Sequence, residues 1–194
     1  MKKKSKKSYI ETTVFILIIF IIYITGLQTE IAGLLQRGVM LTGLHNASIK
    51  KVDEPKKTKL NFNITSLEGD DIKVSTLRGK TIFINFWATW CPPCIAEMPE
   101  IQNLWDDIAS DDIAFLLIST DDEMGKIKSF IERKEFTFPV YKLNGAIPQE
   151  LSSSAIPSTF VIAPDGRIIY KHLGIANYNT KDFKDFLSKV HKGI

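Results

Sequence analysis

The chain has 194 residues and a formal net charge of +3, a length that suits one domain of ordinary size with an appendage. Five of its 25 basic residues fall within the first seven positions, and the other 20 are outnumbered by 22 acidic residues. The basic balance therefore comes from one terminal cluster, and the composition gives no indication of a nucleic-acid partner.

The N-terminal segment combines this lysine cluster with an apolar run over residues 14–24. Extended to residues 9–27, the run has Glu11 as its one charged side chain and would form roughly 28 Å of helix. Lysines before such a segment hold the N-terminus in the cytoplasm. We therefore predict a basic cytoplasmic tail over residues 1–8 and a transmembrane signal anchor over residues 9–27. The protein would be single-pass in the cytoplasmic membrane, with the remaining chain outside the cytoplasm.

A cleaved signal peptide is the competing interpretation, because the apolar run also has the length of a signal-peptide core. Residues 24–26 (ITG) form only a weak cleavage site, and no cysteine directly follows the run, which excludes a bacterial lipoprotein. We favour the uncleaved anchor. Residues 28–58 are predicted as a juxtamembrane segment and linker. Residues 28–44 have partly helical apolar spacing, which fits an interfacial helix or an ordinary tether, and residues 45–58 are polar.

A globular part is expected over residues 59–194, where strand and helix patterns alternate. It begins with a β-hairpin whose turn lies at residues 68–71, followed by a helical turn at residues 75–79. Two nearly all-apolar stretches, Thr81–Trp87 and Ile113–Ser119, predict strands that are buried on both faces.

The remaining part of the chain continues the alternation. We expect a helix from the cysteines to about residue 109, a helix over 123–134, a strand over 138–141, a helical turn over 147–151, strands over 159–163 and 167–172, and a helix over 180–191 capped by Thr180. This order predicts an α/β sandwich with a central mixed β-sheet flanked by helices.

The only two cysteines, Cys91 and Cys94, lie between a predicted strand and the start of a helix. A helix N-terminus favours a thiolate over a thiol, and Pro92 and Pro93 are tolerated in a first helical turn. Cysteines three apart on a helix have Cβ atoms roughly 5–6 Å apart, which a local adjustment can close to a disulfide. We therefore predict a pair that cycles between dithiol and disulfide.

Three other interpretations account for this pair less well. A structural zinc site needs four ligands, whereas the chain offers one cysteine pair and three scattered histidines. A purely structural disulfide closing so small a loop would add little stability. Inert buried thiols fit a lone core cysteine better than a pair flanked by Trp90 and two prolines. No metal and no other cofactor is expected.

Three motifs together resemble the thioredoxin superfamily, and most closely the membrane-anchored thiol–disulfide oxidoreductases of the TlpA/ResA type in bacteria. These motifs are residues 85–94 (NFWATWCPPC), 97–99 (EMP) and 156–160 (IPSTF). The resemblance covers about residues 59–194 and implies a thioredoxin-like fold. It makes Cys91 the exposed nucleophile and Cys94 the buried resolving thiol of a redox-active disulfide.

The same resemblance assigns roles to residues around the cysteines. Pro157 would be a cis proline that exposes the backbone of Ile156 to an extended substrate segment. Ordinary thioredoxins carry a buried Asp where this chain has Asn85, which cannot titrate. ResA-like proteins carry a functional Glu at the position of Glu97, which is therefore expected to accept a proton or tune the thiol pKa. Otherwise it is a solvated residue favoured by the helix dipole. The predicted substrate-binding residues are Trp90, Pro92, Pro93, Ile156 and Pro157.

The expected function is an extracytoplasmic thiol–disulfide oxidoreductase acting on protein thiols or disulfides. The resemblance favours a reductase supplied by a membrane thiol–disulfide transporter, with cytochrome c maturation as one use. The direction of electron flow depends on the reduction potential relative to the partners. A peroxiredoxin-like peroxidase is an alternative, although Thr89 lies two rather than three residues before Cys91. A membrane-anchored thiol chaperone without turnover is the non-enzymatic alternative.

Overall fold

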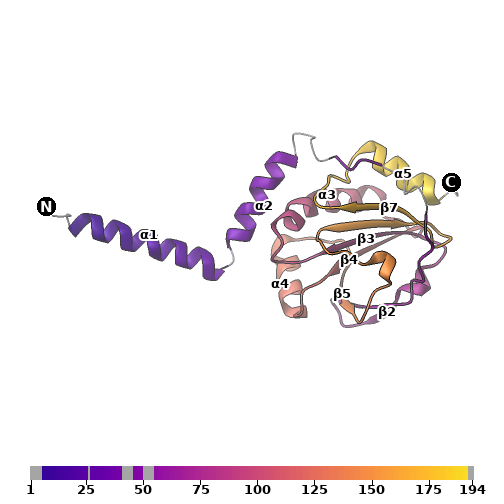
Figure 1. Ribbon diagram of the computed structural model, residues 1–194, viewed down its shortest axis with the longest axis horizontal. Coiled ribbons are helices and arrows are strands. Elements are labelled where there is room, and N and C mark those ends of the chain that lie inside the picture. Colours follow the sequence, from indigo (N-terminus) through magenta and orange to yellow (C-terminus); the bar gives the residue numbers. More distant parts are fainter. Residues whose placement is uncertain (1–5, 26, 41–45, 50–54, 192–194) are drawn as a thin grey trace.

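The computed structural model describes residues 6–25, 27–40, 46–49 and 55–191. Two helices, α1 (Lys6–Thr25) and α2 (Leu27–Met40), precede a domain in which a twisted sheet is covered by helices (Figure 1). The further elements are β1 (Asn63–Ser66), β2 (Asp71–Lys73), η1 (Val74–Leu77), β3 (Thr81–Trp87), α3 (Pro92–Ile108), β4 (Ile113–Ser119), α4 (Met124–Lys134), β5 (Val140–Asn144), η2 (Gln149–Leu151), β6 (Ser158–Ile162), β7 (Ile168–Leu173) and α5 (Lys181–His191).

The seven strands form one mixed sheet in the order β2-β1-β5-β4-β3-β6-β7. The pairs β3–β4 and β4–β5 are parallel, and the other neighbouring pairs are antiparallel. Every residue of β3 is buried, because this strand lies inside the sheet and is covered on both faces. The predicted mixed sheet flanked by helices, with an N-terminal hairpin, is therefore confirmed.

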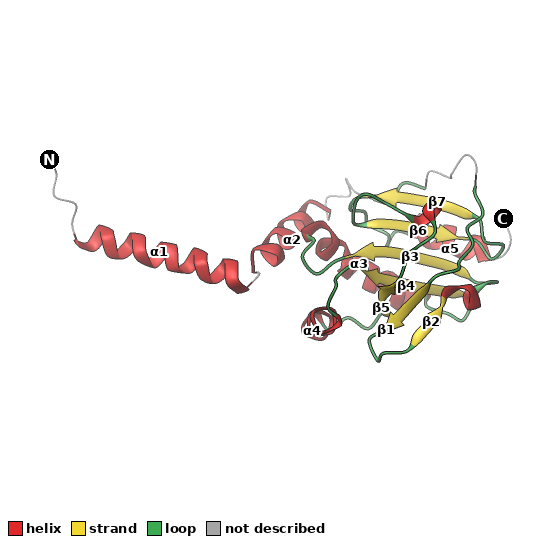
Figure 2. Ribbon diagram, turned by 60° about the horizontal axis from the view of Figure 1, so that its bottom comes forward, coloured by secondary structure: helices red, strands yellow, loops and turns green. Residues whose placement is uncertain are grey.

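Two apolar clusters fill the two faces of the sheet. Buried side chains of α3, α4 and α5 share one cluster with Phe83, Trp87 and Phe115 of the central strands. The opposite face carries the second cluster, which includes Ile84 and Leu151 and is covered by chain around η1 and η2. Figure 2 shows the sheet with α3 and α5 behind it. Helix α3, which follows the carboxyl end of β3, thus lies on the face of the sheet that has the long helices.

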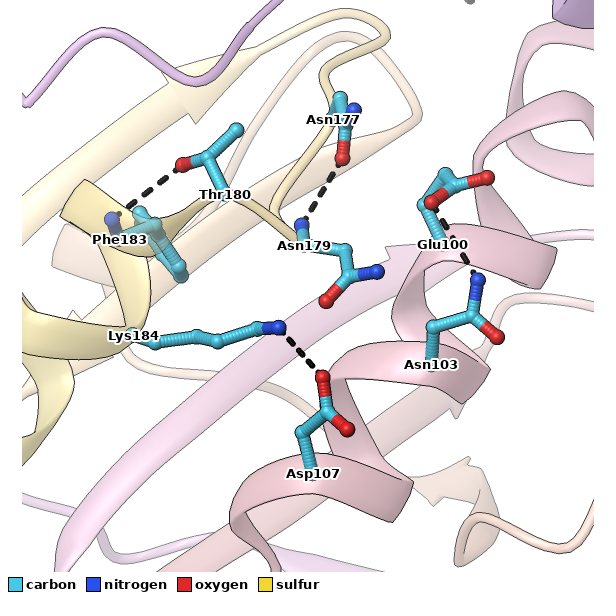
Figure 3. Close-up of polar contacts among 8 residues, drawn as sticks. All are labelled: Glu100, Asn103, Asp107, Asn177, Asn179, Thr180, Phe183 and Lys184. Atoms are coloured by element: carbon cyan, nitrogen blue, oxygen red, sulfur yellow. Dashed lines mark hydrogen bonds and ion pairs between the residues drawn. The ribbon is translucent and has the colours of Figure 1, made fainter.

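Strands β3 and β4 have the predicted bounds, because runs of β-branched and aromatic residues between polar turns fix where each strand begins and ends. Strand β5 differs from its predicted range and begins at Val140, because Pro139 has no N–H to donate to a ladder. Helix α5 begins as expected, with the backbone N–H of Phe183 donating to the Thr180 hydroxyl at 3.3 Å (Figure 3). An ion pair between Lys184 and Asp107 links α5 to α3 in the same view.

The segment predicted as a linker is attached to the domain wherever the structure describes it. The N–H of Ala47 donates to the Asn177 carbonyl, and the N–H of Ile168 donates to the Lys56 carbonyl, both at 3.0 Å. Ala47 is buried in the main core cluster. The described residues of this polar segment therefore pair with the edge of the domain.

Helix α1 ends at Thr25, and Leu27 already belongs to α2, so the predicted span over residues 9–27 is not one helix. Among the described residues no single helix meets the length and hydropathy expected of a membrane span. The segments Tyr9–Thr25 and Leu27–Gly38 meet it as a pair, with a bend of 85° between them. Residues 1–5 of the predicted basic tail lie outside the described residues.

Phe183 provides a test of the core, because its ring packs 5.1 Å from Tyr178, 5.3 Å from Tyr170 and 6.2 Å from Phe83, measured between ring centroids. We expect Phe183→Ala to lower the free energy of unfolding by about 3–5 kcal/mol in urea titrations, since it leaves a cavity under the sheet. Leu173→Ala is the control, because this strand residue is 49% exposed and should change stability by at most about 0.5 kcal/mol. Equal losses in both variants would contradict this assignment of the core.

Candidate active site

The two cysteines are joined in a disulfide at the start of α3, with their Cα atoms 5.3 Å apart. Cys91 is the N-cap residue, and Pro92 and Pro93 occupy the first positions of the helix. Because prolines have no N–H, Cys94 carries the first backbone donor of the helix, and this N–H lies 3.3 Å from the Cys91 sulfur. One helix N–H is therefore directed at the sulfur that would carry negative charge after reduction.

The surface around the disulfide is formed by side chains other than the cysteines. Trp90 is 61% exposed, whereas Cys91 is only 4% exposed and Cys94 is fully buried. The expectation of an exposed Cys91 is therefore wrong for the disulfide form. The chain before β6 lies close to this sulfur, because the carbonyl oxygen of Ile156 is 3.8 Å from Sγ of Cys91. Cys91 nevertheless remains the more accessible of the two sulfur-bearing residues.

The chain before β6 approaches the disulfide from across the site. The peptide bond between Ile156 and Pro157 is cis, as the family resemblance implied. Ile156 is partly exposed and Pro157 is buried, and the Pro157 carbonyl accepts a bond of 2.8 Å from the N–H of Gly174. The predicted substrate-binding residues that reach the surface are Trp90, Pro92, Pro93 and Ile156, whereas Pro157 is buried.

Glu97 is fully buried behind the disulfide, on the second turn of α3. The Asn85 side-chain amide donates to Oε1 at 2.7 Å, and the backbone N–H of Ala176 donates to Oε2 at 3.2 Å. Burial raises the pKa of Glu97 from about 4.5 to about 8, although both hydrogen bonds act in the opposite direction. The interpretation of Glu97 as a solvated helix residue is therefore wrong.

Asn85 connects Glu97 to the strand opposite, because the same amide nitrogen also donates to the Thr159 hydroxyl at 2.9 Å. The amide oxygen of Asn85 is buried and has no hydrogen-bond partner among the described residues. A half-turn of this amide exchanges its nitrogen and oxygen, so the oxygen could accept a hydrogen bond from a protonated Glu97. The site can thus accommodate both protonation states of the carboxyl group without moving the backbone.

Two tyrosines complete the buried surroundings of Glu97. Tyr170 and Tyr178 are almost fully buried, with ring centroids 6.5 Å apart. Burial raises the pKa of both hydroxyls, and the nearby charge of Glu97 raises them further. Both tyrosines are therefore neutral at the pH values where Glu97 titrates, which leaves Glu97 as the proton-exchanging group of this cluster.

A second acidic side chain holds the loop before the cysteines. Asp121 accepts hydrogen bonds from the Thr89 N–H at 2.8 Å and from the Thr89 hydroxyl at 2.7 Å. The Ser119 hydroxyl donates to the same carboxylate at 2.7 Å. Because Thr89 precedes Trp90 directly, these bonds fix the direction in which the chain enters the redox helix.

Sequence reasoning did not identify Thr159, Ala176 or Asp121 as parts of the site. Ala176 contributes a backbone N–H, which no side-chain pattern signals, and Asp121 follows a strand where a loop acid is ordinary. Within the described ranges, no three His, Cys, Asp or Glu side chains come together in a way that could hold a metal ion. The site therefore consists of a disulfide, a buried acid and an exposed apolar rim.

Comparisons with known proteins agree with this geometry. The Redoxin family matches residues 54–187. The thiol-disulfide oxidoreductase ResA of Bacillus cereus is 31% identical over 131 residues, which covers 67% of this chain and 75% of that protein.

Solved structures show the same fold. StoA from Bacillus subtilis aligns with a TM-score of 0.53 and 24% identity over 64% of this chain and 94% of its own. A thiol:disulfide interchange protein of the thioredoxin family from Chlorobium tepidum aligns with a TM-score of 0.56 and 23% identity, over 75% and 99% of the two chains. With its cysteine pair at the start of α3, this chain belongs to the Redoxin family, within the thioredoxin superfamily, as a thiol–disulfide oxidoreductase of the ResA type.

Proposed function

We propose that this protein is a membrane-attached, extracytoplasmic reductase of protein disulfides. The observation that carries the proposal is the fully buried Glu97, with a pKa of about 8, on the same helix as the Cys91–Cys94 disulfide. Extracytoplasmic location is supported by the lysine-rich start and the apolar α1. Maturation of c-type cytochromes, in which apocytochrome cysteines must be reduced, is the proposed use.

The reaction is a two-electron exchange in two steps. In the reduced protein, the Cys91 thiolate attacks one sulfur of a substrate disulfide, forming a mixed disulfide and releasing one substrate thiolate. The Cys94 thiolate then attacks the Cys91 sulfur, which forms the disulfide seen here and releases the second substrate thiolate. The dithiol is oxidised and the substrate disulfide is reduced. A membrane thiol–disulfide transporter is proposed to restore the dithiol by the reverse exchange.

Glu97 is suited to accept the proton of the Cys94 thiol and to return it. Residues three apart on a helix are neighbours, and an ordinary thiol has a pKa of about 8.5. An acid of pKa about 8 can exchange a proton with such a thiol at little free-energy cost. When Glu97 ionises, its negative charge opposes a second negative charge on the neighbouring sulfur.

The proposed direction follows from how weakly the structure stabilises a thiolate. Stabilising the reduced form makes a dithiol pair a stronger oxidant. Here Pro92 and Pro93 remove two N–H groups at the helix start, which leaves the Cys94 N–H as a single helix donor directed at the Cys91 sulfur. The buried acid adds no positive charge. These features favour a pair that gives up electrons.

The peroxidase alternative receives no support from the site. A peroxiredoxin-like mechanism would use a hydroxyl to hold peroxide near the thiolate, whereas the Thr89 hydroxyl donates to Asp121. Turnover separates a reductase from a thiol chaperone, so the direct test is reduction of insulin disulfides by the reduced protein with dithiothreitol as electron source. A protein that binds but does not reduce insulin would contradict the proposed reductase.

The division of labour between the cysteines can be tested by trapping. We expect Cys94→Ser to accumulate mixed disulfides with client proteins, because the resolving thiol is missing and the more accessible Cys91 remains. Cys91→Ser should trap few clients, since Cys94 is fully buried. The measurement is non-reducing electrophoresis of membranes after acid quenching. Equal trapping by both variants would show that the roles are not separated.

The raised pKa of Glu97 predicts a pH-dependent contribution to stability. A group whose pKa is higher in the folded state stabilises the fold below its unfolded pKa, and that stabilisation is lost as the pH rises through the folded value. The free energy of unfolding of wild type relative to Glu97→Gln should therefore fall between about pH 4.5 and pH 8, by at most about 1.4 kcal/mol per pH unit.

Glu132→Gln is the matched control for this experiment, because it makes the same chemical change at an exposed position of α4. The rate of Cys91 alkylation gives an independent readout, since Glu97→Gln should shift its pH profile. Superimposable alkylation profiles for wild type and Glu97→Gln would leave Glu97 without a role in the thiol chemistry.

The proposed anchor predicts an intact N-terminus. If residues 9–27 are not cleaved, mass spectrometry of the mature protein from membranes should recover a peptide that begins at Met1 or Lys2, and carbonate washing should leave the protein in the membrane pellet. A soluble mature form beginning near Leu27 would instead establish a cleaved signal peptide.

A further inference from the structure

Helix α2 is docked directly on the redox helix. Gly33 is buried at the contact, where a Cβ atom would lie 3.2 Å from Cγ2 of Ile95 and 3.3 Å from the carbonyl oxygen of Pro92. One turn later, Arg37 pairs with the nearly buried Glu100 of α3, with 3.7 Å between nitrogen and oxygen. Gly33 therefore permits a close approach that any other residue would hinder, at the first turn of the helix that carries both cysteines.

A different face of α2 is apolar and exposed. It carries the side chains of Leu27, Ile31, Leu34 and Leu35, of which Leu34 and Leu35 are 66% and 71% exposed. Their spacing of three and four residues gathers them on one side of the helix. Leu34 lies at the edge of this face, where it also lines a cavity with Gly33 and Arg37. Exposed apolar side chains also cover α1, which directly precedes α2, so the two apolar surfaces are continuous along the chain.

The bend between α1 and α2 determines how the apolar face of α2 would be oriented relative to a bilayer. The segments Tyr9–Thr25 and Leu27–Gly38 meet at 85°. If α1 stands along the bilayer normal, α2 lies parallel to the membrane surface, which is the position of an interfacial helix. Figures 1 and 2 both show α1 leaving on the side of α2 that faces away from the domain. The bilayer and the domain would therefore lie on different sides of α2.

The same arrangement brings the membrane end of α1 to the redox site. Ile24, Thr25, Gln28 and Thr29 of the two N-terminal helices line one cleft, of about 680 Å³, together with Thr89 and Trp90. The other wall belongs to α4 and includes Lys126 and Phe130. The exposed Trp90, which directly precedes Cys91, thus lies beside the point where α1 would leave the bilayer.

We propose that α2 is an interfacial helix that rests its apolar face on the lipid surface and docks its Gly33–Arg37 face on α3, so that the redox site faces the membrane. The site then exchanges disulfides preferentially with a partner whose reactive cysteine lies at the bilayer surface. This inference rests on the proposed membrane attachment and adds a fixed orientation of the domain, which a tether alone would not supply.

The test compares two alkylating reagents on the same reduced, full-length protein in phosphatidylcholine vesicles. One is a maleimide linked to a phospholipid headgroup and the other is a soluble maleimide, with the Cys91 adduct quantified by mass spectrometry. The ratio of the two rates reports how the site is oriented, because any change in thiol reactivity affects both reagents. Gly33→Leu should separate α2 from α3, and Arg37→Glu should do so by placing like charges against Glu100.

Matched controls lie on the same helix. A Cβ atom at Gly38 meets nothing within 4 Å, and Gln36 is exposed, so Gly38→Leu repeats the first change away from the contact and Gln36→Glu introduces an acid beside it. We expect Gly33→Leu and Arg37→Glu to lower the ratio of lipid-linked to soluble alkylation at least about fivefold, because a freed domain samples many orientations. The controls should keep the wild-type ratio.

An unchanged ratio in both contact variants, or a wild-type protein that does not float with vesicles, would overturn the proposal. Insulin reduction in detergent separates this outcome from the proposed activity. We expect all four variants to reduce insulin as wild type does, since none alters the cysteines or Glu97. Failure of wild type itself to reduce insulin would contradict the reductase and leave the alkylation ratio as an independent measure of orientation.

Discussion

The hydrogen bond from the Asn85 amide to the Glu97 carboxyl group joins the central strand to the redox helix in a place without access to solvent. A buried acid is costly unless it is hydrogen-bonded or neutral, and here both conditions act on the same group. Asn85 and the Ala176 N–H supply its partners, while burial keeps it protonated up to about pH 8. One polar contact inside the apolar packing of α3 on β3 therefore sets the proton chemistry of the site.

Ordinary thioredoxins resemble this chain but carry Asp where it has Asn85, and this difference has a physical consequence for the contact with Glu97. Two carboxyl groups at this distance would repel each other if both were ionised, and one pKa would rise further. An amide can instead donate to an ionised Glu97 or, after a half-turn, accept from a protonated one. The chain thus places the buried carboxyl group on the helix, three residues after Cys94, and makes the strand residue a neutral partner of either state.

Sequence reasoning predicted the parts of the fold that depend on local pattern. Thr81–Trp87 and Ile113–Ser119 are nearly all-apolar strands, and the cysteine motif marks the start of α3. Sequence reasoning did not predict the contacts between segments that are distant in the chain. The burial of Glu97 depends on Ala176, which comes 79 residues later and contributes only its backbone. Gly33 in a helical pattern indicates nothing more than low helix propensity until α3 lies against it.

Because α2 packs against α3, the N-terminal region differs from a flexible tether. A flexible tether raises the local concentration of a domain near its anchor and leaves the domain free to rotate. A helix that contacts Pro92 and Ile95 on one side and exposes leucines on another couples the orientation of the disulfide to that of the helix. Because Cys91 is only 4% exposed, disulfide exchange requires a partner to approach through the rim near Trp90. In the proposed arrangement, orientation of that rim by α2 would decide which partners reach the sulfur, and part of the selectivity would lie outside the thioredoxin-like domain.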